Sequence, residues 1–284
     1  MINYKRFWPN YRSWQRQCLY PLISVSVALS ICLSTSLPSK AIDLLPLLFQ
    51  GVQVFNLSRM SDSQEVNLGQ QMNQELQQEV NISSNSQLNR YIEQIGSRLA
   101  ANSDRPNLTY TFQVVEDPAV NAFATTGGFV YVNTGLIKVA DNEAELASVL
   151  GHEMGHIEGK HLLKQMREKA AINGIASATG LSKSKAVGLG VQLALNLPHS
   201  RKDEYDADRR GLRTLTRTGY APSAMVSFMK KLQRSSSLPT FLSTHPGASD
   251  RVLALQKQIN NQPSYKNNGL DNTIYQSKMR AFLQ

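Results

Sequence analysis

Cysteine is scarce in this chain of 284 residues, and the two that occur, Cys18 and Cys32, both lie near the N-terminus. If that stretch is removed from the mature protein, no thiol and no disulfide remain. A zinc site built only from cysteine is then excluded, so any metal must be bound by histidine and carboxylate side chains. With 41% hydrophobic and 18% charged residues, the composition is otherwise that of a globular protein with room for one full core or two small ones.

A large excess of basic residues is also missing once residues 1–41 are set aside. The formal net charge of the whole chain is +9, but residues 1–41 contain five basic residues and no acidic one, which leaves 25 basic and 21 acidic residues in the remainder. This balance, and the lack of a basic patch interleaved with aromatic residues, argue against a nucleic-acid partner.

Residues 1–41 have the layout of a secretory signal peptide. A basic segment is followed by an uncharged, mostly apolar or small stretch from Leu19 to Leu37, and Ser39 and Ala41 then suit a cleavage site. Two alternatives remain open: an uncleaved membrane anchor, because this stretch is just long enough to span a bilayer, and a lipid attached to Cys32. All three predict export to the periplasm or another extracytoplasmic space, the latter two with attachment to the membrane through the N-terminus. Residues 42–60 are expected to be a linker.

Hydrophobic spacing and turn residues predict helices and short strands between residues 61 and 132. Ser61–Val80 and Leu88–Leu99 carry apolar residues at helical spacing, and the first of these begins with a capping-box pattern. Thr109–Val115 and Phe129–Val132 are rich in β-branched and aromatic residues and are predicted to be strands. The pair Gly127-Gly128 marks a turn just before the second strand.

The most informative pattern is His152-Glu153-Met154-Gly155-His156, an H-E-x-x-H sequence in a helix predicted to begin at Asn142. Residues four apart lie on one face of an α-helix, so both imidazoles can bind one Zn²⁺ ion, and Glu153 can reach a water on that ion. The alternative is a solvated helix on which these residues occur by chance. The metal interpretation therefore requires a third ligand.

Three glycines, Gly151, Gly155 and Gly159, repeat every four residues beside the two histidines. Each costs about 0.5–1 kcal/mol relative to alanine inside a helix, so we expect another backbone to approach this bare strip closely. His161 lies about 180° around the helix from His152 and is not expected to be a ligand.

A second helix is predicted from Ser200 to about Arg217, and it carries Glu204 and Asp208 on one face. Alone, two like charges four residues apart would indicate a solvated acidic surface. Together with the H-E-x-x-H helix, Glu204 is better explained as the third zinc ligand. Asp208 is then expected to accept a hydrogen bond from the far nitrogen of a ligand histidine.

Two further histidines and one apolar segment have less specific surroundings. His199 precedes the helix cap and is expected to be structural or exposed. His245 lies in a loop before a proline and is a candidate for polarising a substrate carbonyl or for occupying the fourth position on the zinc. Residues 170–197 are small and apolar but include Lys183 and Lys185, which favours two short helices, or a helix and a mobile loop, over a membrane span.

Together these blocks resemble the HtpX-like and BepA-like zinc metallopeptidases, relatives of the CAAX prenyl protease. The resemblance covers roughly residues 60–255 and depends on four segments in order: Asn121-Ala122-Phe123-Ala124 with the glycine pair, Gly151–His156, Ser200–Gly211, and Thr244-His245-Pro246 with Arg251. It implies one zinc ion per chain, bound by His152, His156 and Glu204, and a role in quality control of envelope or membrane proteins. The transmembrane helices of the HtpX-like members and the C-terminal helical repeats of the BepA-like members have no counterpart, as expected of a short exported form.

The resemblance also implies a fold of the α+β class. Residues 61–255 are expected to form a zincin-type metallopeptidase domain, mainly helical, with a small mixed or antiparallel sheet beside the H-E-x-x-H helix. A C-terminal helix and tail are expected over residues 256–284.

These features predict a zinc endopeptidase in which Glu153 takes a proton from the attacking water and later delivers it to the leaving amine. The expected substrate is an unfolded or extended polypeptide aligned along an edge strand from Thr125 to Val132, with contacts at Gly127, Gly128, Phe129 and Val130. An alternative is a zinc-stabilised chaperone or adaptor that cleaves nothing, which would fit if His245 closed the fourth position. A membrane-bound scaffold that uses residues 170–197 is a third hypothesis.

Overall fold

The chain divides into two units, residues 1–52 and 53–284, and the computed structural model describes residues of the second unit only. The described residues are 54–55, 57, 59–172, 181–235, 239–261 and 266–283. The predicted signal peptide and most of the predicted linker lie outside them, as do residues 173–180. Within the described part of the chain, no helix combines the length and the apolar character that a membrane span requires.

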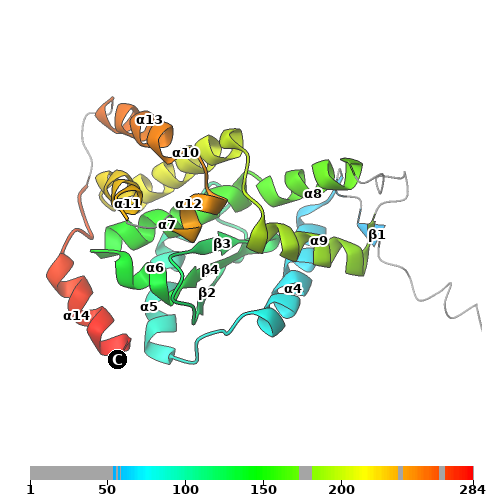
Figure 1. The fold of residues 1–284 in the computed structure, drawn as a ribbon, viewed down its shortest axis with the longest axis horizontal. Helices are drawn as coiled ribbons and strands as arrows, with labels where there is room; N and C mark the ends of the chain where they lie inside the picture. The colour runs from blue at the N-terminus through cyan, green and yellow to red at the C-terminus, as the bar shows by residue number, and fades with distance from the viewer. Residues whose placement is uncertain are drawn as a thin grey trace, which may run out of the picture. The chain divides into compact units, whose positions relative to one another are not determined.

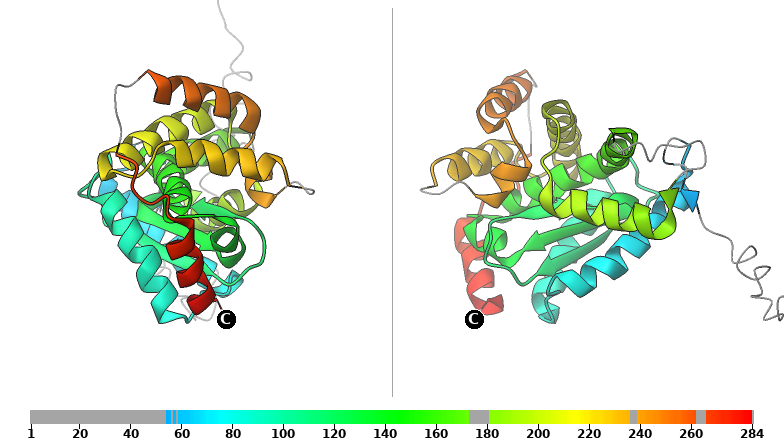
Figure 2. Two further views of the ribbon diagram at one scale, coloured as in Figure 1. Left: turned by 90° about the vertical axis from the view of Figure 1, so that its left-hand side faces the viewer. Right: turned by 45° about the vertical axis from the view of Figure 1, so that its right-hand side comes forward.

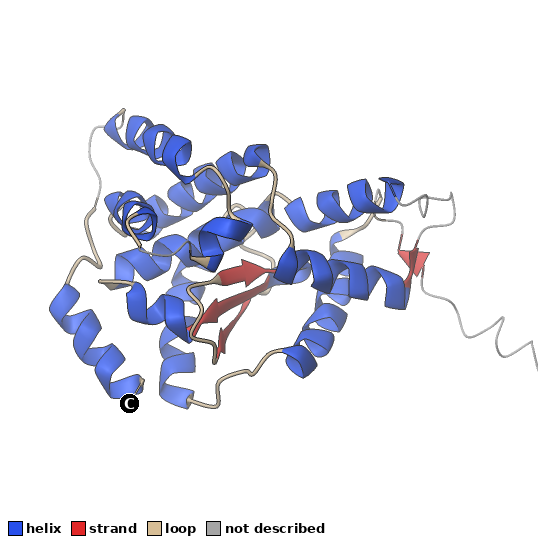
Figure 3. Ribbon diagram, viewed as in Figure 1, coloured by secondary structure: helices blue, strands red, loops and turns tan. Residues whose placement is uncertain are grey.

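A three-stranded mixed sheet lies among the helices of this unit (Figure 1, Figure 3). Its strands are β2 (Thr111–Val115), β3 (Ala122–Ala124) and β4 (Phe129–Asn133), in the order β2-β4-β3. β4 is parallel to β2 and antiparallel to β3. A separate antiparallel pair consists of β1 (Val54–Phe55) and β5 (Leu181–Ser182). The predicted α+β class with a small sheet is confirmed.

The position of β4 differs from the predicted one. The sequence suggests an exposed edge strand from Thr125 to Val132, but β4 is the central strand and is paired on both sides. The prediction that Phe129 and Val130 lie on an edge open to a substrate is therefore wrong. Gly127 and Gly128 belong to the 3-10 turn η2 (Thr126–Gly128) that leads into β4. The edge strand that packs against the H-E-x-x-H helix is β3.

Helices α4 (Asp62–Glu79) and α5 (Ser86–Ala100) are the two predicted before the sheet. The capping box of α4 is complete, because the Ser61 hydroxyl accepts from the N–H of Gln64 and the Gln64 side chain accepts from the N–H of Ser61. At the start of α5 the Asn85 side chain accepts two backbone hydrogen bonds. These caps satisfy N–H groups that a helix start would leave without partners.

The H-E-x-x-H sequence lies in α7 (Glu143–Glu158), which follows the short helix α6 (Thr134–Val139). All residues of α7 from Ala144 to Glu158 are buried. Asn142 caps the helix by accepting from the N–H of Glu145, as predicted. The Glu145 carboxylate accepts from the N–H of Asp141 and pairs with Lys231 at 2.5 Å, so it does not return a hydrogen bond to the N–H of Asn142.

Helix α10 (Arg201–Thr218) packs along α7 and begins at the predicted cap, Ser200. The two helices approach closely where both carry small residues. A Cβ at Gly211 would lie 2.8 Å from the carbonyl oxygen of Gly151, and one at Gly155 would lie 2.5 Å from that of Ala207. The predicted close approach of a second backbone is confirmed at Gly151 and Gly155.

The remaining helices extend this arrangement. Two short helices, α8 (His161–Ile172) and α9 (Lys183–Asn196), flank the undescribed residues 173–180, and α11 (Ser223–Gln233), α12 (Thr240–Thr244) and α13 (Ala248–Asn260) follow α10. Helix α14 (Asn272–Phe282) returns to lie beside α5 (Figure 2), where the Asn85 side chain donates to the carbonyl of Phe282 at 2.6 Å. Residues of the predicted C-terminal tail therefore join the domain core.

Both faces of the sheet are buried, because successive strand residues point to opposite sides. On one face Phe112, Val130 and Val132 belong to a core that also contains residues of α5, α7 and α11. On the other face Phe123 and Tyr131 belong to a second core shared with α4, α8 and α9. This packing holds β3 and α7 in a fixed relation, and the candidate site lies on α7.

Candidate metal centre

Successive turns of α7 direct His152 and His156 toward one point. Their Nε2 atoms lie 3.1 Å apart, and both side chains are buried. Burial lowers the pKa of each imidazole, which favours the neutral form that binds metals.

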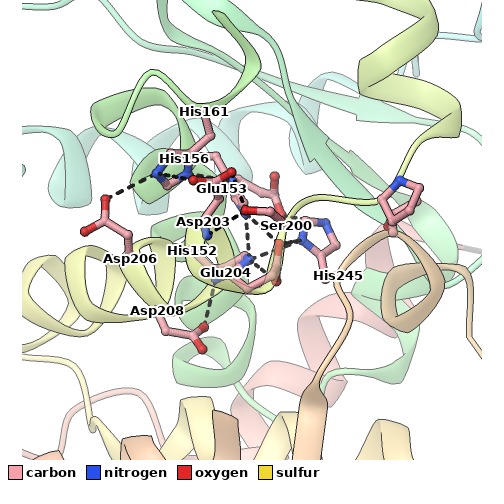
Figure 4. Close-up of polar contacts among 12 residues, drawn as sticks. His152, Glu153, His156, His161, Ser200, Asp203, Glu204, Asp206, Asp208 and His245 are labelled. Atoms are coloured by element: carbon pink, nitrogen blue, oxygen red, sulfur yellow. Dashed lines mark hydrogen bonds and ion pairs between the residues drawn. The ribbon is translucent and has the colours of Figure 1, made fainter. Parts of the chain in front are cut away.

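Two more side chains reach the same point from α10 and from the end of α12 (Figure 4). Glu204 Oε1 lies 3.3 Å from His156 Nε2, and Glu204 Oε2 lies 3.6 Å from His152 Nε2. His245 Nδ1 lies 3.3 Å from His152 Nε2 and 3.2 Å from Glu204 Oε1. All four residues are buried.

These four ligand atoms lie close enough together to hold a single metal ion. They all lie within 4.8 Å of one another. Atoms bound about 2.0–2.1 Å from a tetrahedral zinc ion are about 3.3–3.4 Å apart, and four of the pairs in this cluster are separated by 3.1–3.3 Å. Imidazole nitrogen and carboxylate oxygen are also ligands that zinc accepts, so both the spacing and the chemistry suit it.

Glu153 is a buried carboxylate that accepts no hydrogen bond from the described residues. The nearest cationic candidate is His245, whose Nε2 lies 3.5 Å from Oε1. Burial raises the pKa of this carboxyl. A buried, unsatisfied carboxylate costs free energy unless a molecule in the site donates to it, and a water poised for deprotonation would do so.

Asp208 and Arg251 contact the ligands His152 and Glu204 and fix their orientation. Asp208 Oδ1 lies 3.0 Å from His152 Nδ1, where a carboxylate fixes the tautomer that leaves Nε2 free for a metal. Arg251, which is 1% exposed, donates to both oxygens of Asp208 at 2.7 Å and to Oε2 of Glu204. One guanidinium therefore stabilises two buried carboxylates.

Comparison with known proteins agrees with this geometry, since residues 86–259 match Peptidase family M48. The chain belongs to peptidase family M48. This membership confirms the suspected family and, with the ligand cluster, the predicted class of zinc metallopeptidase with zinc as its cofactor.

Several curated proteins are similar to this M48 peptidase. The putative beta-barrel assembly-enhancing protease of Vibrio cholerae is 33% identical over 198 residues, which cover 63% of this chain and 40% of that protein. Metalloprotease LoiP of Escherichia coli is 29% identical over 225 residues, 75% of this chain and 87% of the relative. Mitochondrial metalloendopeptidase OMA1 of Arabidopsis thaliana is 34% identical over 156 residues, 54% and 32% of the two chains. The chain spans between 39% and 45% of the length of the beta-barrel assembly-enhancing proteases that it matches.

His245 occupies the fourth corner of the ligand cluster. Its Nδ1 lies 3.3 Å from His152 Nε2 and 3.2 Å from Glu204 Oε1, so His245 could provide a fourth ligand to a metal ion held by this cluster. A zinc site with four protein ligands is closed, whereas a catalytic site keeps one position open. Cleavage by this M48 peptidase would therefore require His245 to leave this corner.

His199 lies closer to the site than its sequence context suggests. Its ring stacks on that of His156, with ring centroids 4.0 Å apart and 29° between the planes, and its backbone N–H donates to the carbonyl of Thr244 at 3.0 Å. No pattern in the sequence could have placed it there, because the contact depends on how the segment before α10 crosses the end of α7.

His161 is not among the ligand atoms, as expected, but it contacts one of the ligands. Its Nδ1 lies 3.0 Å from Nδ1 of His156, and its Nε2 lies 3.2 Å from Asp206 Oδ2. Burial and the neighbouring His156 lower the pKa of His161 to about 4. A straight helix would put this ring on the far side, but α7 ends at Glu158. The break at Gly159 was the signal that could have revealed this placement.

Proposed function

We propose that this chain is an exported zinc endopeptidase that cleaves unfolded or extended polypeptides of the envelope or of a membrane, as part of protein quality control. The carboxylate of Glu153 carries the proposal, because it is buried, accepts no hydrogen bond from the described residues and follows His152 at the ligand cluster. The names of two relatives, beta-barrel assembly-enhancing protease and mitochondrial metalloendopeptidase, support an envelope or membrane-associated substrate.

In this mechanism His152, His156 and Glu204 hold the zinc ion and Glu153 moves the proton. Bound there, zinc would supply Lewis-acid chemistry that polarises the scissile carbonyl and makes the attacking water more acidic. Glu153 accepts a proton from that water and then donates it to the leaving nitrogen. Its raised pKa helps the second step, because a weaker acid holds the proton until the amine can take it.

The edge of β3, which is buried at Ala122 and partly exposed at Ala124, is where a substrate backbone would align. Ala122 and Ala124 face Val132 and Val130 in the antiparallel register. The neighbouring positions carry the hydrogen bonds to β4, for example from the N–H of Thr125 to the carbonyl of Phe129 at 3.0 Å. Because hydrogen-bonded pairs alternate in an antiparallel ladder, the N–H and C=O groups of Ala122 and Ala124 point away from β4.

An extended polypeptide added at this edge would meet the metal centre. β3 packs against α7, and a small cavity beside it is lined by Ala124, His156 and His199. Pairing along an edge strand uses the backbone of the substrate and is therefore tolerant of its sequence. This suits a peptidase whose substrates share an unfolded state more than a sequence motif.

A non-proteolytic chaperone or adaptor is the second candidate, and the position of His245 favours it. If His245 never leaves the fourth corner, the site is structural in kind and Glu153 has no water to deprotonate. Removal of this imidazole side chain distinguishes the two candidates, since it opens the fourth position in both but only a peptidase then cleaves a substrate.

The test combines zinc content with hydrolysis of casein by the wild-type chain and by His245→Ala. We expect one zinc ion per chain in both and casein cleavage that is faster for His245→Ala. Cleavage should stop on addition of a chelator and return with added zinc. A zinc-bound protein that cleaves no casein, even as His245→Ala, would contradict the proposal and favour the adaptor.

A further inference from the structure

The two ligand histidines of α7 differ in the group that contacts Nδ1, the ring nitrogen that faces away from the metal centre. His152 Nδ1 faces the carboxylate of Asp208 directly, at 3.0 Å. His156 Nδ1 faces another imidazole, His161, whose Nδ1 lies at 3.0 Å. Within the described residues, the carboxylate on this side is one step further away, at Asp206.

The backbone between α7 and α8 is bent in a way that brings His161 under His156. Lys160 has a φ of 52°, a left-handed conformation that non-glycine residues rarely adopt. Its ammonium group is held by Asp62 at 2.7 Å and by Glu65 at 3.0 Å. A Cβ at position 159 would overlap the ring of His161, so Gly159 leaves the space that the ring fills. A strained turn maintained by surrounding contacts is typical of a functional constraint.

The number of protons on each ring determines which atom donates and which accepts in the contacts from His156 through His161 to Asp206. If His156 binds the ion through Nε2, its proton is on Nδ1 and is donated to His161. His161 Nδ1 must then be an acceptor, which puts the His161 proton on Nε2, 3.2 Å from Asp206 Oδ2. Both hydrogen bonds, from His156 to His161 and from His161 to Asp206, can therefore form at once with a single tautomer of each imidazole.

Asp206 is itself fixed at the end of this sequence. Arg210 donates to its Oδ2 through Nε at 2.7 Å, and Arg209 pairs with its other oxygen. The neighbouring Asp203 is 3.9 Å from His161 Nε2 and is engaged by Lys164 at 2.7 Å. Asp206 is thus the acceptor for His161, while Asp203 serves the start of α10, where Ser200 binds it.

From this geometry we propose that His161 is a positioning residue for the metal centre: it orients His156 through Nδ1 and is itself oriented by Asp206. The inference rests on the proposed zinc function of the site. Hydrogen-bond partners of ligand histidines fix the ring and raise its basicity, and their loss weakens metal binding about 10–100-fold. His161 touches neither substrate nor ion, so its effect passes entirely through His156.

The test measures the zinc dissociation constant by competition with a zinc-binding fluorescent chelator, which needs no proteolytic activity. His161→Leu removes the acceptor while retaining much of the volume, and we expect it to bind zinc about 10–100-fold more weakly. His161→Asn places an amide oxygen near the position of Nδ1 and should bind zinc nearly as tightly as the wild type. Gly159→Ala, which leaves no room for the ring, should resemble His161→Leu.

Two results would overturn the inference. The first is His161→Leu binding zinc as tightly as the wild type, and the second is equal losses for His161→Leu and His161→Asn, which would indicate packing and not the hydrogen bond. Circular dichroism of the zinc-free variants establishes that each is folded, and Asp206→Asn, with the ring intact, provides an independent variant with an expected smaller loss. A wild-type chain that binds zinc but cleaves nothing would contradict the proposed function and leave this inference standing.

Discussion

At the scale of single residues, the centre depends on which buried charges have partners. Glu204 and Asp208 share the guanidinium of Arg251, whereas Glu153 accepts no hydrogen bond from the described residues. The first two carboxylates are thereby held ionised in fixed positions, and the lack of such a hydrogen bond leaves Glu153 able to exchange a proton. The same environment therefore separates groups that bind an ion from a group that performs acid–base chemistry.

Replacement of Arg251 by methionine should destabilise the protein strongly. The change leaves two buried carboxylates without their cation, and loss of one partner of a buried ion pair costs about 3–5 kcal/mol of unfolding free energy. Urea denaturation measures it, and added zinc should recover part of the loss because the ion also neutralises Glu204. Arg201→Met, at an exposed pair with Asp250, is the control and should change stability by less than about 0.5 kcal/mol. Equal stabilities of the two variants would contradict this role of Arg251.

The sequence predicts those residues of the site whose relation is local. His152, Glu153 and His156 share one helix, and their spacing alone predicts their common face. Glu204 could be predicted as the third zinc ligand because it lies four residues from Asp208 on one helix face, where two like charges repel unless a cation neutralises them. Helical periodicity does not predict the contacts of His161 and His199. The contact of His161 depends on the turn at Gly159, which only the position of that glycine indicates, and the contact of His199 depends on a chain crossing that leaves no pattern in the sequence.

At the scale of secondary-structure elements, the site depends on how closely α10 packs on α7. Glu204 and Asp208 reach His152 and His156 because glycines at 151, 155 and 211 let the two backbones approach. The cost of glycine inside a helix is offset by this contact. Helix ends were predictable from Ser61, Asn142 and Ser200, whose side chains bind the first turn whatever the tertiary fold. Strand β3 was missed, because three residues are too few to show a period.

Substitution by alanine should lower the free energy of unfolding at Gly155 and raise it at Gly188. At Gly155 the added Cβ would lie 2.5 Å from the carbonyl oxygen of Ala207, which should separate the helices and cost about 1–3 kcal/mol of unfolding free energy. At Gly188, in α9, a Cβ would meet nothing within 4 Å, so helix propensity alone should raise stability by up to about 1 kcal/mol. Thermal and urea denaturation compare the two. A Gly155→Ala variant as stable as Gly188→Ala would contradict the close packing of α7 and α10.

At the scale of the whole described unit, one buried carboxylate connects several elements. Glu65, on α4, pairs with Arg105 at 2.9 Å and with Lys160 at 3.0 Å, and it accepts from the hydroxyl of Thr126 at 3.1 Å. It thereby joins the start of α4, the end of α7 and the turn beside β3. Burial alone would raise the pKa of Glu65, but the hydrogen bonds and charges of Arg105 and Lys160 outweigh burial and lower it below 4.5.

This lowered pKa predicts acid lability. A carboxyl whose pKa is lower in the folded than in the unfolded state stabilises the fold above the unfolded pKa, and that contribution is lost as the pH falls through the folded pKa. The free energy of unfolding should therefore decline below about pH 4.5. Glu65→Gln should be less stable than the wild type at pH 7 and should show a shallower decline, as measured by urea denaturation at a series of pH values. Glu168→Gln, at an exposed position of α8, is the control. The prediction would be contradicted if the unfolding free energy of Glu65→Gln fell with decreasing pH as steeply as that of Glu168→Gln.

The most direct test of a zinc peptidase centred on α7 is the rate of casein hydrolysis by Glu153→Gln, measured together with its zinc content. The substitution keeps the size of the side chain and all ligands but removes the base, so we expect one zinc ion per chain and a rate at least about 100-fold lower. Glu168→Gln, which makes the same chemical change at an exposed position, should match the wild type in both measurements. Wild-type cleavage by zinc-loaded Glu153→Gln would contradict the assignment of the catalytic base.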